Sequence, residues 1–248
     1  MTVKRIVKAI KFSKAFKVYI VIPLYSEGIP GSSNLQEILH WQYHTLRYMF
    51  KEINRNLRLY KSSASVEDYL RFFFLGKIET PPKTQAPQIP AHQIYVHSKL
   101  MIIDDYYCLI GSGNINDRSL NGSRDTELSV GVSQAYFTPY QENGEWALPK
   151  ADIYGFRVLL WVEHFGEYYD WMDNPGSQAT WDKVVEIATE NYKAYLNPEI
   201  YSKEKHSFIM TYPLNSQNIE LEEDIKIPHF QVSIKGNKNR IMPEGITT

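Results

Sequence analysis

The chain has 248 residues, 43% of them hydrophobic, and its 27 basic and 28 acidic residues leave a net charge of −1. This length can bury the core of one large or two small domains, and the balanced charge provides no global attraction to nucleic acid. The single cysteine, Cys108, excludes a disulfide framework and a cysteine-based metal site, and it suits a reducing, cytoplasmic setting. No run of 18 apolar residues predicts a membrane-spanning helix.

The first 17 residues contain six Lys or Arg and no acidic residue. Val3, Ile6, Val7 and Ile10 recur at helical spacing, so this segment is predicted to be an amphipathic helix. One interpretation is a helix on a membrane surface or a transit peptide. The favoured interpretation is an outer helix that packs its apolar stripe on a sheet, because a predicted strand follows directly.

The next segments alternate between strand and helix. Residues 18–23 form a continuous apolar run that ends at a proline, which is typical of a buried parallel strand. Ser33 is predicted to cap a helix over 34–56. Residues 69–75 are predicted to form a second buried strand, and 80–92, with four prolines, a loop.

The second half of the chain continues the alternation. Two strands, 93–103 and 106–111, are predicted to form a hairpin that turns at Asp104-Asp105, and 128–132 is predicted to be a strand. Helices are expected at 155–166 and 180–196, with Trp161, Phe165, Trp181 and Tyr192 in the core. The order of elements predicts an α/β fold with a mixed sheet flanked by helices.

One constellation of polar residues stands out in the predicted hairpin. The spacing H-x-K-x4-D-x6-G-S-x-N occurs once, at His97, Lys99, Asp104, Gly111-Ser112 and Asn114. Six residue types at fixed spacing are unlike a chance pattern. A structural histidine is the usual alternative for a lone histidine, and that interpretation is retained for His40, His44, His92, His206 and His229, with His164 expected in the core.

These residue types suit phosphoryl transfer. Side chains alternate along a strand, so His97, Lys99 and Met101 are expected on one face. An imidazole can attack phosphorus or transfer a proton near neutral pH, and an ammonium group can neutralise a phosphate oxygen. Ser112 and Asn114 can donate hydrogen bonds to the same anion. We predict that His97 and Lys99 are catalytic and that Lys99, Ser112 and Asn114 bind phosphate.

Two acidic residues complete the predicted catalytic set. Asp104 has the opposite strand parity to His97, so it is expected to fix the turn by accepting hydrogen bonds rather than to do chemistry. Glu127 opens the strand 128–132 and could hold the imidazole tautomer, as in a His–carboxylate dyad. Asp104 and Asp105 alone offer too few oxygen ligands for a metal ion, so no metal site is predicted.

The segment resembles the H-K-D motif of the phospholipase D superfamily. The flanking sequences Asn114-Ile-Asn-Asp-Arg-Ser119 and Arg124-Asp-Thr-Glu127 are similar to the eukaryotic phospholipase D signature. Resemblance to the plant-type enzymes, which carry a C2 domain, rests on Val21-Ile-Pro23 with Glu27-Gly-Ile-Pro30, on Gly155-Phe-Arg-Val-Leu-Leu-Trp161 with Glu163-His164, and on Ile246-Thr-Thr248. The resemblance is colinear over nearly the whole chain.

The resemblance implies hydrolysis of phosphatidylcholine-like lipids to phosphatidic acid and a free head group. In this family two H-K-D motifs on two lobes meet at one site, where one histidine forms a phosphohistidine and the other transfers protons. His97 matches the second motif, with the acid/base role. Lys99, Ser112 and Asn114 match phosphate binders, and Glu127 matches the acid that orients the histidine. Calcium is a possible cofactor through the resemblance alone.

No second H-x-K stands in the 248 residues, and no sequence resembles the first lobe or a C2 domain. We therefore expect residues 1–248 to form one C-terminal lobe of the bilobal fold, with a motif core at 93–132 and a helical and tail region at 151–248. A second H-K-D lobe is expected in trans, from a second copy or a separate chain, as is weak, peripheral contact with a phospholipid membrane. Two alternatives are an inactive lobe that binds anionic lipid head groups or a partner, and a homodimeric nuclease, which the balanced charge disfavours.

Overall fold

The computed structural model describes residues 1–79, 91–134, 141–142, 145–146, 150–197, 207–215, 220–221 and 233–238. The chain divides into two compact units, one of Met1–Val96 with Pro175–Ile241 and one built on His97–Asn174. The division falls inside the predicted motif core, and the arrangement of 1–248 as a single lobe stays a prediction. Among the described helices, none combines the length and the apolar character needed to cross a bilayer.

The first unit contains a mixed four-stranded sheet. Strand β1 (Val18–Val21) is parallel to β2 (Leu70–Ile78), whereas β3 (Ala91–Ile94) and β9 (Ile209–Thr211) both pair with β2 in the antiparallel sense. The central strand β2 is buried along most of its length, as an apolar run with both faces covered should be. Two shorter strands, β10 (Leu214–Asn215) and β11 (Glu220–Leu221), pair separately.

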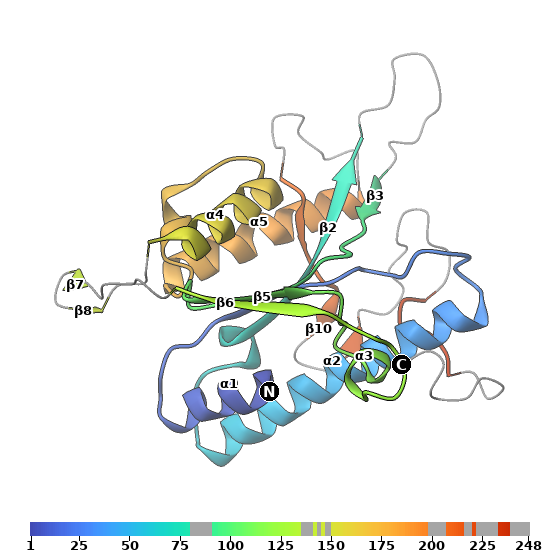
Figure 1. The fold of residues 1–248 in the computed structure, drawn as a ribbon, viewed down its shortest axis with the longest axis horizontal. Helices are drawn as coiled ribbons and strands as arrows, with labels where there is room; N and C mark the ends of the chain where they lie inside the picture. The colour runs from blue at the N-terminus through green and yellow to red at the C-terminus, as the bar shows by residue number, and fades with distance from the viewer. Residues whose placement is uncertain are drawn as a thin grey trace. The chain divides into compact units, whose positions relative to one another are not determined.

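Helices cover both faces of this sheet (Figure 1). Phe72 of β2 stacks on Phe50 of α2 (Ser33–Leu59), with ring centroids 6.0 Å apart. Tyr19 of β1 meets Trp181 of α5 (Gln178–Leu196) edge to face at 4.7 Å. Tyr19 lies beside Arg71 in the register, so Tyr19 and Phe72 point to opposite faces. A 3₁₀ turn, η1 (Val66–Asp68), leads into β2.

The basic N-terminal segment forms helix α1 (Thr2–Lys11), which packs beside α2 (Figure 1). Ile6, Ala9 and Ile10 are at most 3% exposed and belong to the same apolar core as the inner residues of α2. The inward apolar stripe of the predicted outer helix is confirmed. The element that α1 contacts most is helix α2, whereas packing on a sheet was predicted.

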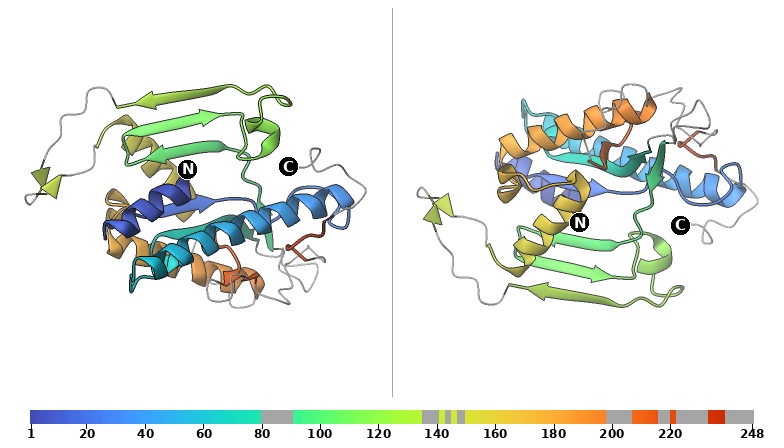
Figure 2. Two further views of the ribbon diagram at one scale, coloured as in Figure 1. Left: turned by 90° about the horizontal axis from the view of Figure 1, so that it is seen from below. Right: turned by 90° about the horizontal axis from the view of Figure 1, so that it is seen from above.

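The second unit is built on an antiparallel sheet of β4 (Lys99–Ile103), β5 (Tyr107–Gly111) and β6 (Ser129–Ser133), which Figure 2 shows side by side. Three helical elements and one pair of short strands complete it: α3 (Asp117–Leu120), α4 (Asp152–Phe165), the 3₁₀ turn η2 (Asp170–Asp173), and the strands β7 (Gln141–Glu142) and β8 (Glu145–Trp146).

The predicted α/β class with a mixed sheet flanked by helices is confirmed, and so is the hairpin that turns at Asp104-Asp105. Several boundaries were wrong; for example, the predicted strand 69–75 continues to Ile78, and the predicted helix 155–166 begins at Asp152. Residues 93–103 are not one strand, because β3 ends at Ile94 in the first unit and β4 begins at Lys99 in the second. The cap of α2 is Ser32, since the helix begins at Ser33. Residues 91–92 of the predicted loop are strand, and 80–90 lie outside the described residues.

Candidate active site

His97 and Lys99 occupy the entrance to β4. His97 lies in the irregular segment 95–98 and is exposed, and Lys99 is the first residue of the strand. The prediction that both project from one continuous strand is therefore wrong in detail. The Lys99 ammonium donates a 2.6 Å hydrogen bond to the carbonyl oxygen of His97, so the two residues of the H-x-K pair contact each other directly. This bond holds a positive charge beside the backbone that carries the imidazole.

The Gly111-Ser112 turn lies next to Lys99 because Lys99 pairs with Gly111 in the β4–β5 register. Gly111 in turn pairs with Ser129 of β6, and a Cβ atom at Gly111 would lie only 2.2 Å from the Ser129 Oγ. A side chain at 111 would therefore push β6 away. The Ser112 amide donates to the Leu128 carbonyl at 3.0 Å, and the Leu128 amide donates to the Ser112 Oγ at 3.1 Å. Gly111 thus allows the turn to lie close enough to the start of β6 for these two hydrogen bonds to form.

Glu127 is held at this connection by two serine hydroxyls. Ser112 Oγ donates to one carboxylate oxygen and Ser119 Oγ to the other, each at 2.5 Å. These two bonds lower the pKa of Glu127, Ser112 contributing first, and the positive charges of Lys99 and Arg118 lower it further. A fixed, ionised carboxylate is the acceptor that an imidazole N–H requires. The predicted contact between Glu127 and His97 stays a prediction.

Ser119 is a residue of this cluster that the sequence analysis missed. Its hydroxyl donates to Glu127 and accepts a 3.0 Å hydrogen bond from the Asn114 amide. Its own amide donates to the Asn116 side-chain oxygen, which caps the short helix α3. The only sequence signal for Ser119 was its position as the fifth residue after Asn114. A serine that follows a turn can have many structural roles, so this position alone did not identify a site residue. Ser119 links the turn that carries Asn114, whose side chain is exposed, to the carboxylate.

The two aspartates of the hairpin turn have opposite environments. Both have positive φ, +53° at Asp104 and +50° at Asp105, and the Tyr106 amide closes the turn on the Ile103 carbonyl at 3.0 Å. Asp104 is exposed, whereas Asp105 is 2% exposed and accepts two 2.7 Å hydrogen bonds from Arg157 of α4. The anchoring of the loop that was expected of Asp104 is performed by Asp105.

Arg157 also donates to the Met172 carbonyl at 2.7 Å and lies over the rings of Tyr154 and Trp161. This buried guanidinium ties α4 and η2 to the hairpin that carries the motif. In the second unit Phe165 is buried as predicted, while Trp161 is half-buried.

Lys99, Ser112 and Glu127 are brought together at one end of the β4–β6 sheet, and His97 precedes Lys99 at the same end. The Lys99 ammonium can approach a phosphate oxygen there, with an imidazole two residues away along the chain, whereas the Ser112 hydroxyl donates its proton to Glu127 and its predicted binding of phosphate stays a prediction. This arrangement can bind a phosphodiester and transfer a proton. Within the described ranges, no group of three or more His, Cys, Asp or Glu could hold a metal ion, and a role for calcium stays a prediction.

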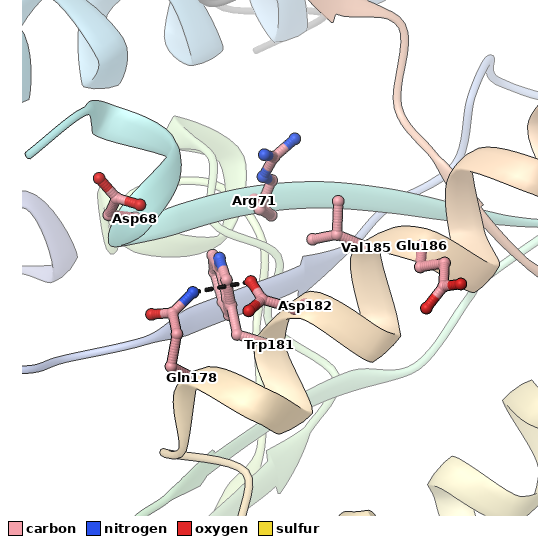
Figure 3. Close-up of a pocket in the computed structure, with 7 residues that line it drawn as sticks. All are labelled: Asp68, Arg71, Gln178, Trp181, Asp182, Val185 and Glu186. Atoms are coloured by element: carbon pink, nitrogen blue, oxygen red, sulfur yellow. Dashed lines mark hydrogen bonds between the residues drawn. The ribbon is translucent and has the colours of Figure 1, made fainter.

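A pocket of about 290 Å³ lies in the first unit, between the start of β2 and α5 (Figure 3). Trp181 is among the residues that line it, and the Gln178 side-chain amide donates a 2.7 Å hydrogen bond to Asp182, drawn as a dashed line in Figure 3. None of the predicted site residues lines it. His92 lies in β3 of the same unit, and His206 and His229 lie outside the described residues.

The chain was compared with known proteins. A family model described as phospholipase D matches residues 1–236. Phospholipase D delta of Arabidopsis thaliana is 35% identical over 98% of this chain, and phospholipase D alpha 1 of Vigna unguiculata is 35% and that of Zea mays 33% identical over 98%. The chain spans about a third of the length of these relatives, 29% of the first and 32% of the other two. The chain belongs to the phospholipase D family.

Proposed function

We propose that this chain supplies one half of a phospholipase D active site, which cleaves phosphatidylcholine-like phospholipids into phosphatidic acid and a free head group. The observation that carries the proposal is the cluster of Lys99, Ser112 and Glu127 beside His97, in the H-x-K-x4-D-x6-G-S-x-N spacing. The cationic Lys99 suits a phosphodiester anion. The ionised Glu127 suits an imidazole that must carry a proton.

In the proposed reaction a histidine from a second H-K-D lobe attacks phosphorus. The bond between phosphorus and the head-group oxygen breaks, and His97 gives its proton to that oxygen, which leaves as an alcohol. The neutral His97 then takes a proton from water as the water oxygen attacks the phosphorus. The bond between phosphorus and the other histidine breaks, phosphatidic acid is released, and His97 is protonated again. Lys99 and Asn114 hold the phosphoryl oxygens throughout, while the Ser112 hydroxyl holds the Glu127 carboxylate.

Support for a second lobe comes from the surface of the β4–β6 sheet. Ile110, Val130 and Val132 lie on one face of this sheet and are between 47% and 54% exposed, whereas Met101 and Ile103 lie on the other face at 40% and 42%. Exposed apolar residues on a sheet face suit contact with another protein surface. The second lobe could belong to another copy of this chain or to a separately encoded chain, at the cytoplasmic surface of a membrane.

The proposal is tested by choline release from a short-chain phosphatidylcholine. The full chain is assayed alone and mixed with a lobe that carries a first H-K-D motif, each as the wild type, the His97→Asn variant and the His92→Asn variant. We expect release by the wild type in at least one of the two conditions, a loss of at least 10³-fold for His97→Asn, and no loss for His92→Asn. The two histidines lie five residues apart in the sequence, so the pair controls for a nonspecific effect.

Two other outcomes would replace the proposal. Binding of phospholipid without choline release in either condition would indicate an inactive lobe. Release of nucleotides from single-stranded DNA, lost in His97→Asn and without lipid turnover, would indicate a homodimeric nuclease. The balanced charge of the chain makes the nuclease the weaker alternative.

A further inference from the structure

Helix α1 presents a basic surface to solvent. Residues 1–17 carry six positive and no negative side chains, and Lys4, Arg5, Lys8, Lys11 and Lys14 are exposed. In the described part of the chain, none of these five residues forms a salt bridge with an acidic side chain.

The apolar side of helix α1 packs inside the first unit and is not available to a membrane. Ile6, Ala9 and Ile10 are buried in the core of the first unit. An amphipathic helix that enters a bilayer must give its apolar face to the acyl chains, and α1 cannot do so without unpacking this core. The exposed large apolar residues Met1 and Phe12 flank the helix, and the Lys11 ammonium lies 5.6 Å from the Phe12 ring centroid. Interaction with a membrane through α1 is thus restricted to the charges and these helix ends.

The charge distribution along the chain also favours approach to an anionic surface through the basic N-terminal segment. The whole chain carries −1 and its first 17 residues carry +6, so the remainder carries −7. An anionic surface attracts the basic residues 1–17 and repels the net negative remainder of the chain.

We propose that the exposed basic side of α1 binds the surface of anionic phospholipid bilayers by electrostatic attraction, without insertion of the helix. This inference deepens the proposed function, because its substrate lies in a bilayer and its product, phosphatidic acid, is an anionic lipid. Accumulating product would then retain the chain at the membrane. Since the interaction is electrostatic, binding weakens with added salt.

The test is sedimentation of the full chain with vesicles of phosphatidylcholine alone or with about one third phosphatidic acid. One triple variant carries Lys4→Gln, Lys8→Gln and Lys11→Gln. The matched control carries Lys77→Gln, Lys183→Gln and Lys193→Gln, three exposed lysines elsewhere in the first unit with the same change in net charge. Each cation near an anionic surface contributes about fivefold, so the α1 variant should bind about 100-fold more weakly and the control much as the wild type does.

Equal weakening of both triple variants would overturn the proposal, because net charge alone would then explain binding. Equal binding of the wild type to both vesicle types would also overturn it, as would binding to single-stranded DNA in place of vesicles. Circular dichroism establishes that each variant is folded. The His97→Asn variant should bind vesicles like the wild type, so failure of membrane binding and failure of the proposed catalysis are distinguished.

Discussion

The adjacent residues Asp104 and Asp105 offer a matched pair for testing what anchors the catalytic hairpin. Both lie at positive φ in the same turn, and an asparagine accepts that backbone conformation as readily as an aspartate does. Asp104→Asn and Asp105→Asn therefore make the same chemical change in the same backbone setting. Only Asp105 is buried and paired with Arg157.

Replacing Asp105 removes the negative charge and one of two 2.7 Å hydrogen bonds, and it leaves the Arg157 guanidinium buried without a counter-ion. Removal of one partner from a buried ion pair costs about 3–5 kcal/mol. For a chain of this size that corresponds to a fall of about 6–20 °C in the melting temperature. Asp104 is exposed, so its replacement should change the free energy of unfolding by about 0.5 kcal/mol or less.

The assay is thermal and urea unfolding followed by tryptophan fluorescence. Trp161 is a local probe, because its ring centroid is 5.1 Å from the central guanidinium carbon of Arg157. A double-mutant cycle with Arg157→Met should give a coupling energy that accounts for most of the Asp105→Asn effect. Equal effects of the two asparagine substitutions, or a larger effect at Asp104, would refute the assignment of the anchor to Asp105.

Three further outcomes are expected. Gly111→Ala should destabilise the chain by about 1–3 kcal/mol in urea unfolding, because its Cβ would lie 2.2 Å from Ser129 Oγ. Gly113→Ala, where the nearest atom is 3.7 Å away, should cost far less, and the reverse order would contradict the close approach of the turn to β6. Because the pKa of Glu127 is lowered from its usual 4.5, the stability that its hydrogen bonds contribute is present above that value and is lost as pH falls through the lowered pKa. Ser119→Ala should raise this pKa in a ¹³C NMR titration of the carboxyl group, and an unchanged titration would exclude Ser119 as a support of Glu127. Ser119→Ala should also reduce choline release more than it reduces stability, whereas a proportional loss of both would indicate a purely structural role.

The sequence alone predicted the main elements because their signals are local. The helical spacing of Ile6 and Ile10 predicted a helix face that is buried in the structure. The apolar run at 18–23 predicted a buried parallel strand, and the strand is parallel but ends at Val21 and is only half-buried. The residue types of the motif could likewise be recognised, because chemistry of this kind restricts which side chains can occupy the spacing.

What could not be predicted depends on long-range pairing. Asp104 and Asp105 differ by one position, and only the packing of α4 determines that Asp105 meets Arg157, 52 residues away. The end of β3 at Ile94 was missed because β3 pairs with β2, a partner that strand periodicity does not reveal. His97 was placed on a strand for the same reason. Ser119 was missed because its role is set by its distance from Glu127.

The central claim is that His97 transfers protons in a site whose nucleophile lies on another H-K-D lobe. The most direct test uses phosphatidyl-p-nitrophenol, whose leaving group needs no general acid, with a mixture of that lobe and the His97→Asn chain. We predict one equivalent of p-nitrophenol, then a stop, with the phosphatidyl group trapped on the histidine of the other lobe, because no base remains to activate water. Continuous turnover by the His97→Asn mixture, or a phosphatidyl group on His97 in the wild-type mixture, would contradict the account.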